Sequence, residues 1–159
     1  MFIIQEESSY QKLFSKGFGS KTGEYFLLNA YEAMYLLETG KIKIRNSRKE
    51  VLTEEYFIEK KVIDYNLYIV FRDLRSKGYI VKSGIKYGFI FRVYDKGVKL
   101  GQEHSKYLVE VYKENESMKI RDFSAKSRVS HSTRKNILFA VIDCENSITY
   151  FETNWKRIL

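Results

Sequence analysis

Apolar residues recur at steps of three and four over residues 27–38, which predicts an amphipathic helix there. Good helix formers fill this stretch, and Thr39 and Gly40 follow it as a stop signal. The alternating pattern of residues 41–45 then predicts a short strand. Residues 1–24 are polar and rich in Gly and Ser, and their pattern predicts no element.

Two further helices are expected before the middle of the chain. Thr53 followed by two glutamates is typical of a helix start. A longer helix is predicted over residues 64–76 from its apolar spacing, and Lys77 and Gly78 end it.

The second half of the chain is rich in strand patterns. Alternation or continuous apolar character predicts strands at residues 79–82, 87–94, 106–112, 137–142 and 148–153. Residues 121–135 are expected to be helical in their later part, with Lys135 near the C-terminal end of the helix. The fold class is therefore α/β (α+β). We expect a small N-terminal α/β domain at residues 1–78 and a C-terminal domain at 79–159, with a central mixed sheet flanked by helices.

The net charge of the chain indicates what kind of partner it could bind. The 159 residues include 28 Lys+Arg and 20 Asp+Glu, a formal net charge of +8, and many of the basic residues fall in residues 78–136. Such an excess suits a polyanionic partner, although charge that only aids solubility explains it equally well.

Other compositional features exclude several classes of protein. Cys144 is the single cysteine, so neither an internal disulfide nor a Cys-rich metal site is expected. The two histidines and scattered carboxylates form no metal-ligand pattern, and residues 17–23 lack the order of a phosphate-binding loop. No apolar run approaches the ~20 residues of a membrane span. We expect a cytoplasmic protein without metal or cofactor and without a membrane partner.

Three residues stand out as candidate catalytic groups: Tyr94, His104 and Lys135. A phenol, an imidazole and an amine can move protons and stabilise charge around a phosphodiester without a metal. Each residue alone has a structural explanation, as a packing tyrosine, a surface or capping histidine, and a lysine that complements a helix dipole.

The segments around these residues carry a resemblance. The relevant stretches are LLNAYEAMYLLETGKI from Leu27, YIVFRDLRSKGYIVKSG from Tyr68, KYGFIFRVY ending at Tyr94, EHSKYLVEV around His104, and RVSHSTRK ending at Lys135. Together they resemble the tRNA-splicing endonuclease family of archaeal type, from about Leu27 to Trp155. The resemblance implies a catalytic subunit of an enzyme that excises introns from precursor tRNA.

The resemblance also implies a mechanism. The family cleaves RNA without metal by attack of the 2′-hydroxyl on the adjacent phosphate, which leaves a 2′,3′-cyclic phosphate and a 5′-hydroxyl. By this resemblance Tyr94 would be the general base, His104 the general acid, and Lys135 the group that stabilises the transition state. Because tyrosine has an ordinary pKa of about 10, Tyr94 would need a nearby cation such as Lys135 or Arg92. Alternatively, Tyr94 positions the nucleophile and His104 has another proton role.

Two more residues are implied in RNA binding. Family members hold a bulged base between an arginine and a second flat or cationic side chain. Arg128 matches the arginine, and Trp155 lies where some members have an aromatic residue, although Trp155 could instead pack on the last strand. His131 is expected to cap or pack rather than react.

The family's substrate, the bulge–helix–bulge fold, has two scissile bonds, so the resemblance implies a tetramer of this chain alone or with a related structural subunit. In relatives the last strand, here residues 147–154, pairs with a dimer mate. Asp143 and Glu145 would be either an acidic docking loop or a solvated turn. The alternative function is a non-catalytic structural or RNA-binding subunit, against which the three intact candidate residues argue.

Overall fold

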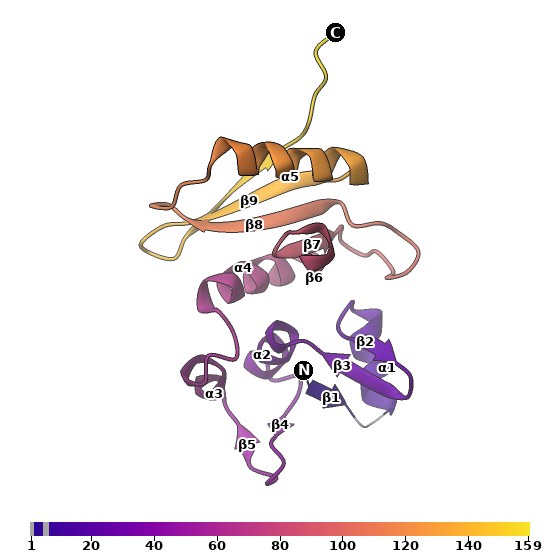
Figure 1. Cartoon of the computed structure of the whole chain (residues 1–159). Coiled ribbons are helices and arrows are strands. Elements are labelled where there is room, and N and C mark those ends of the chain that lie inside the picture. The colour runs from indigo at the N-terminus through magenta and orange to yellow at the C-terminus, as the bar shows by residue number, and fades with distance from the viewer. Residues whose placement is uncertain (1, 5–6) are drawn as a thin grey trace. The chain divides into compact units, whose positions relative to one another are not determined.

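The computed structural model describes residues 2–4 and 7–159. It divides into two compact units, Met1–Arg72 and Asp73–Leu159, and each is described by itself. Figure 1 labels most of the elements and colours them in chain order. Their bounds are β1 Phe2–Ile4, α1 Glu7–Ser15, β2 Ser20–Thr22, β3 Tyr25–Leu28, α2 Ala30–Glu38, β4 Ile44–Arg45, β5 Val51–Leu52, α3 Glu54–Glu59, α4 Tyr65–Ser76, β6 Ile80–Ser83, η1 Ile85–Tyr87, β7 Phe91–Tyr94, β8 Tyr107–Lys113, α5 Ile120–Thr133, β9 Asn136–Ile142 and β10 Ile148–Thr153.

The first unit contains an antiparallel sheet in the order β1-β3-β2 and the helix α2. The helix begins at Ala30 rather than at residue 27, because Asn29 caps it. The Asn29 side chain accepts a hydrogen bond from the Glu32 backbone N–H, and the Glu32 carboxylate accepts one from Asn29. Leu27 and Leu28 therefore belong to β3, so this part of the prediction was wrong. The buried Glu32 carboxylate also accepts a hydrogen bond from Gly19.

Other predictions in this unit were partly confirmed. Helix α3 begins after Thr53 as expected, and α4 follows the predicted helical pattern up to Ser76. The short strand predicted at 41–45 is reduced to Ile44–Arg45, which pairs with β5. Among the described residues of the first 24, where no element was predicted, the structure contains β1, α1 and β2. The proposed domain boundary after residue 78 remains a prediction, while the two compact units divide at Arg72, inside α4.

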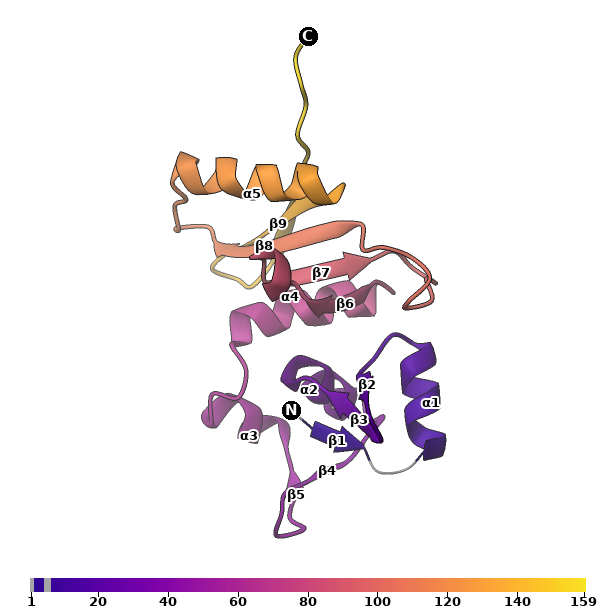
Figure 2. The same ribbon diagram turned by 45° about the vertical axis from the view of Figure 1, so that its right-hand side comes forward.

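The second unit is built on a five-stranded mixed sheet in the order β10-β9-β8-β7-β6. Strands β8 and β9 are parallel, and the other neighbouring pairs are antiparallel. The parallel pair needs a crossover connection, which α5 supplies. Figures 1 and 2 show α5 lying along the sheet beside β8 and β9. The predicted fold class is confirmed.

The two faces of this sheet differ in what covers them. Under α5, Leu108, Ile137 and Phe139 form a buried cluster with Phe89. Partly buried residues pack against that cluster, namely Tyr87, Tyr112, Met118, Phe123 and Val129. On the opposite face, a largely apolar cavity of about 190 Å³ is lined by residues that include Leu74, Val93 and Tyr150.

Two predictions in this unit were wrong in ways that matter for the site. The strand predicted at 87–94 begins only at Phe91, because the chain first turns through η1 and Gly88 adopts the left-handed conformation (φ 75°). Helix α5 extends over Ile120–Thr133, and Arg134 ends it with a positive φ of 54°. Lys135 therefore lies in the connection from α5 to β9, not within the helix.

Gly84 closes the turn that precedes β7. A Cβ atom at this position would lie 2.7 Å from the backbone carbonyl carbon and oxygen of Phe91. We therefore expect Gly84→Ala to lower the free energy of unfolding by about 1–3 kcal/mol through overpacking. Urea unfolding followed by circular dichroism measures this change. Ser124→Ala, on an exposed part of α5, should change stability by less than about 0.5 kcal/mol, and equal effects of the two substitutions would contradict the expectation.

Candidate active site

The strand register brings the three candidate catalytic segments to one end of the sheet. Tyr107 in β8 pairs with both Val93 of β7 and Asn136 of β9. Tyr94 directly follows Val93, and Lys135 directly precedes Asn136. The backbone N–H of Lys106 donates to the Val93 carbonyl (2.8 Å), and the Asn136 N–H donates to the Lys106 carbonyl (3.1 Å). His104 is two residues before Lys106 and therefore enters the same end from the loop before β8.

Tyr94 lies on the face of the sheet that α5 covers. Arg92 is in register with Leu108, which is in register with Ile137 of the cluster under α5. Side chains alternate along a strand, so Arg92 and Tyr94 point to the same side. The Arg92 guanidinium carbon is 5.7 Å from the Tyr94 ring centroid. The Nε atom of Arg92 is buried and has no hydrogen-bond partner in the described part of the chain. The structure thus places the Arg92 guanidinium over the Tyr94 ring.

Lys135 is held by both its backbone and its amine. Its N–H donates to the Ser130 carbonyl (3.0 Å), and the Ser130 hydroxyl donates to the Lys135 carbonyl. The amine Nζ donates to the Thr133 carbonyl at 3.2 Å, and the residue is only 8% exposed. A largely buried ammonium with a fixed position is a suitable group for stabilising negative charge in a transition state.

Tyr87 is a member of this site that sequence reasoning missed. Its ring centroid is 5.5 Å from Lys135 Nζ and 4.8 Å from Lys86 Nζ. Burial acts to raise the pKa of the Tyr87 phenol, but a hydrogen bond with Lys86 and the charges of Lys135 and Arg92 hold it below its ordinary value. The available signal was the Lys-Tyr-Gly sequence, in which Gly88 marks a turn rather than a strand.

His104 differs from the other two candidates because its residue is exposed. It lies in the β7–β8 loop, where Leu100 and Glu103 form an isolated bridge. The ion pair between Lys106 and Asp95 (3.4 Å) links the two ends of this loop. The structure thus brings all three segments together, with Tyr94 and Lys135 buried and His104 open to solvent.

The two predicted RNA-binding residues lie on α5 and the C-terminal segment. Arg128 is exposed on α5, one turn before His131. The His131 ring lies 4.1 Å, centroid to centroid, from the ring of Trp155, which is 44% exposed. His131 thus packs against an aromatic ring, and Trp155 contacts α5 while leaving part of its surface accessible.

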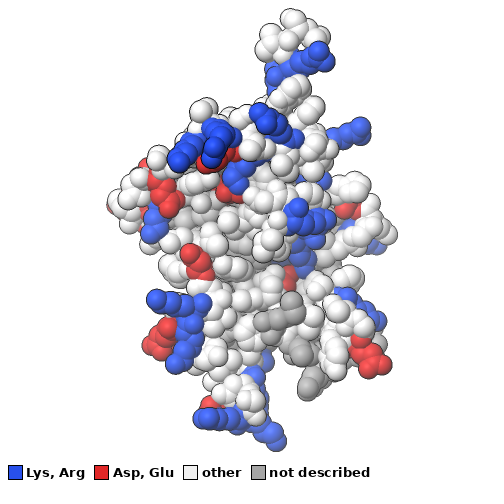
Figure 3. Space-filling view, viewed as in Figure 1, with Lys and Arg blue, Asp and Glu red and all other residues white. Residues whose placement is uncertain are grey.

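Positive charge is concentrated in the unit that carries these residues. Asp73–Leu159 contains 17 Lys+Arg and 10 Asp+Glu, which is +7 of the +8 formal charge of the whole chain. In Figure 3, Lys and Arg side chains are spread over α5 and the C-terminal segment, with some carboxylates between them. This distribution favours a polyanionic partner for the second unit.

The two acidic residues of the β9–β10 turn, Asp143 and Glu145, have different environments. The Asp143 carboxylate accepts hydrogen bonds from the backbone N–H groups of Glu145 (2.9 Å) and Ser147 (2.8 Å). Asp143 therefore shapes its own turn, whereas Glu145 is exposed.

Two properties of the described residues concern metals and membranes. Over residues 2–4 and 7–159, no group of three or more His, Cys, Asp or Glu side chains is placed to hold a metal ion. None of the helices in that same part of the chain is long and apolar enough to cross a bilayer.

Comparison with known proteins gives the family. Residues 65–150 match the model of the tRNA intron endonuclease catalytic C-terminal domain, and residues 2–58 match that of its N-terminal domain. The two matches define the chain as an endonuclease with an N-terminal and a catalytic C-terminal domain. It belongs to the tRNA intron endonuclease family, as its relatives also show.

Similar proteins cover almost the whole chain. The tRNA-splicing endonuclease of Methanothermobacter thermautotrophicus is 40% identical over 157 residues, 97% of this chain and 92% of the relative. That of Pyrococcus abyssi is 37% identical, over 99% of this chain and 92% of the relative. That of Methanococcus vannielii is 32% identical, over 98% and 90%. The resemblance noted in the sequence is confirmed.

Proposed function

We propose that this chain excises introns from precursor tRNA by cutting both junctions of a bulge–helix–bulge fold. The reaction is a metal-independent transesterification in which the 2′-hydroxyl attacks the adjacent phosphorus atom and the bond to the 5′-oxygen breaks. The products carry a 2′,3′-cyclic phosphate and a 5′-hydroxyl. One observation carries this proposal: the register through Tyr107 joins the segments of Tyr94, His104 and Lys135 at one sheet end.

The environment of each residue supports a role. Tyr94, beside the Arg92 guanidinium, would take the proton from the 2′-hydroxyl or align that hydroxyl for attack. His104, exposed on its loop, would protonate the leaving 5′-oxygen. Lys135, fixed by Thr133, would stabilise the additional negative charge on the phosphorane-like transition state.

Cleavage of a bulge–helix–bulge RNA in excess chelator tests the chemistry. We expect cutting at both junctions, 5′ ends that accept phosphate from polynucleotide kinase directly, and 3′ ends that resist phosphatase until acid opens the cyclic phosphate. Cutting that requires added Mg²⁺ would overturn the metal-independent mechanism. Ends with a 5′-phosphate would overturn attack by the 2′-hydroxyl. Tight binding without cutting, in an assembly of the correct size, would support the alternative of a non-catalytic subunit.

Arg128 and Trp155 are proposed to hold a bulged base. Stacking of a base on an aromatic ring contributes about 1–3 kcal/mol, so Trp155→Ala should raise the Kd for RNA by roughly 5- to 150-fold. A substrate with 2′-deoxy groups at the scissile positions allows binding to be measured without cleavage. Trp155→Phe should retain most of the affinity, and Arg128→Ala should weaken binding more than Arg128→Lys. Unchanged affinity in Trp155→Ala would mean that Trp155 only packs on His131.

The proposed assembly is a tetramer, because one chain carries one candidate site and the substrate has two scissile bonds. It consists of this chain alone or of this chain with a related structural subunit. In it β10 would pair with its dimer mate, and the exposed Glu145 would serve as an acidic docking residue. Light scattering of the purified chain should give four times the chain mass of 18.9 kDa for a homotetramer. The proposed compartment is the cytoplasm, where the exposed thiol of Cys144 stays reduced.

A further inference from the structure

Tyr87 lies between the apolar cluster under α5 and the amine of Lys135. Its ring packs on the cluster under α5, which contains Leu108 and Ile137. The same ring faces the amine of Lys135 at 5.5 Å. An ammonium within about 6 Å of an aromatic centroid is attracted by the ring quadrupole, and this attraction is stronger where water is excluded. Lys135 is 8% exposed and Tyr87 is partly buried, so the contact is partly shielded from water.

The turn that carries Tyr87 is closed by its own backbone. The Tyr87 N–H donates to the Gly84 carbonyl (2.8 Å), and the Gly88 N–H donates to the Ile85 carbonyl (2.9 Å). Gly84 N–H in turn donates to the Ile90 carbonyl at 3.0 Å. These bonds fix the backbone from which the Tyr87 ring projects.

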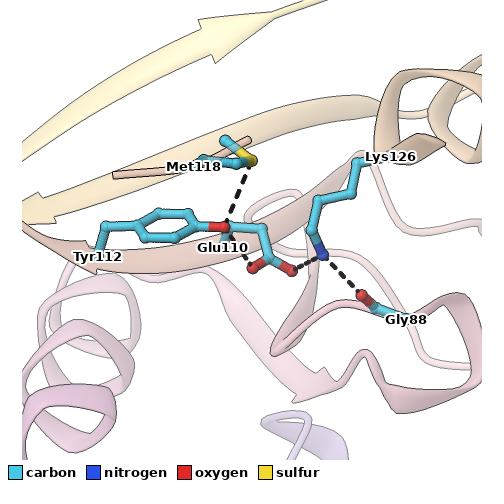
Figure 4. Close-up of polar contacts among 5 residues, drawn as sticks. All are labelled: Gly88, Glu110, Tyr112, Met118 and Lys126. Carbon is cyan, nitrogen blue, oxygen red and sulfur yellow. Dashed lines mark hydrogen bonds and ion pairs between the residues drawn. The ribbon is translucent and has the colours of Figure 1, made fainter. Parts of the chain in front are cut away.

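An ion pair under α5 then fastens this turn to the helix, as Figure 4 shows. The amine of Lys126 donates to the Gly88 carbonyl (3.0 Å) and forms an ion pair with the buried carboxylate of Glu110 (2.8 Å). Tyr112 reaches the same carboxylate and the sulfur of Met118 at 3.5 Å. Gly88 follows Tyr87 directly, so helix, sheet and turn are joined one residue from the ring.

We propose that Tyr87 is a positioning residue whose aromatic ring holds the Lys135 ammonium in place for the reaction. This inference rests on the proposed function of Lys135. The Lys135 amine donates a hydrogen bond to the Thr133 carbonyl, with 3.2 Å between Nζ and the oxygen. The Tyr87 ring limits the movement of the same amine on another side. The depressed pKa of the Tyr87 phenol is consistent with the same geometry, since cations surround the ring.

The ring contact can be tested without RNA. With lysine Cε labelled by ¹³C, the Hε resonances of Lys135 should be shifted upfield by the ring current and should return toward the ordinary lysine position in Tyr87→Leu. Lys135→Met identifies the resonance by removing it. An unshifted Lys135 resonance in the wild-type chain would overturn the inference, whatever the chain does to RNA.

The kinetic consequence is measured by a double-mutant cycle on bulge–helix–bulge RNA. Misplacement of a catalytic group by about 1 Å can cost 10²-fold, so Tyr87→Leu should lower the single-turnover rate at saturating RNA by about 10- to 100-fold. The RNA concentration at half-saturation should not change. In a Lys135→Met background, Tyr87→Leu should have no further effect, because the group that it positions is gone.

Two control variants distinguish the effect of the Tyr87 ring on Lys135 from the loss of its hydroxyl and from the loss of any lysine–tyrosine contact. Tyr87→Phe keeps the ring and should cleave within about threefold of wild type. Tyr79→Leu removes a comparable contact, with Lys96 Nζ at 5.0 Å from the Tyr79 ring, but away from Lys135, and should leave the rate unchanged. The inference would be overturned if Tyr87→Phe lowered the cleavage rate as much as Tyr87→Leu does. It would also be overturned if the rate reductions of Tyr87→Leu and Lys135→Met multiplied in the double variant. Wild-type cleavage by Lys135→Met would instead overturn the proposed function. If Tyr87→Leu does not fold, Tyr87→Met provides the same comparison.

Discussion

Replacement of His104 by alanine is expected to lower the rate of RNA cleavage by about 10²- to 10⁴-fold, the usual contribution of a general acid or base. The leaving 5′-oxygen is a poor leaving group until it is protonated, and His104 is the exposed imidazole at the sheet end that carries Tyr94 and Lys135. Since His104 is exposed on a loop, its removal should leave stability nearly unchanged. The measurements are the single-turnover rate at saturating RNA and the melting temperature of the variant.

A modified substrate assigns the role of His104. Sulfur in place of the bridging 5′-oxygen leaves as a thiolate and needs no proton. If His104 is the general acid, His104→Ala should cut this substrate at nearly the wild-type rate, whereas the variant at Tyr94, Tyr94→Phe, should still cut it slowly. Rescue of Tyr94→Phe but not of His104→Ala would reverse the two assignments. His131→Ala is the matched control, because this histidine packs on Trp155 and should retain the wild-type rate of the chemical step.

The sequence predicted the elements of the sheet well because alternation and apolar runs report burial directly. Strands β8, β9 and β10 lie within a residue of their predicted bounds, since β8 and β10 alternate and β9 is a continuous apolar run. The same signal was misleading at Tyr87, where the alternation of Tyr87, Phe89 and Phe91 continues through a turn. Tyr87 and Phe89 belong to or pack on the cluster under α5, but Tyr87 lies in the turn η1 and the extended strand begins only at Phe91.

The residues that make up the site were harder to predict from the sequence than the fold of the chain. Tyr94, His104 and Lys135 could be selected because their motifs have recognisable sequences. Their meeting depends on the register in which Tyr107 pairs with both Val93 and Asn136, and register between distant strands is not encoded in local periodicity. The contact of Tyr87 with Lys135 depends in addition on the exact end of α5 at Thr133, a boundary that propensity does not determine.

Lys126→Met is expected to give the largest loss of stability among the substitutions considered. Lys126 forms an ion pair with Glu110, whose side chain is 8% exposed, and also donates to the Gly88 carbonyl. Loss of one partner of a buried pair leaves an uncompensated charge and costs about 3–5 kcal/mol. Because the Lys126 side chain is 22% exposed, we expect the lower end, about 3 kcal/mol. Urea unfolding followed by circular dichroism measures the loss.

Two comparisons establish that burial, rather than charge alone, causes this loss. Arg121 and Asp122 form a pair at 3.8 Å on the same helix, with side chains 87% and 52% exposed, so Arg121→Met should change stability by less than about 1 kcal/mol. Glu110→Leu combined with Lys126→Met removes both charges and should recover most of the stability lost in the single variant. That double variant still lacks the hydrogen bond to Gly88, so it should remain slower in cleavage than wild type because the Tyr87 turn is less firmly held. If instead Lys126→Met unfolds at the same urea concentration as Arg121→Met, the ion pair under α5 does not stabilise the fold.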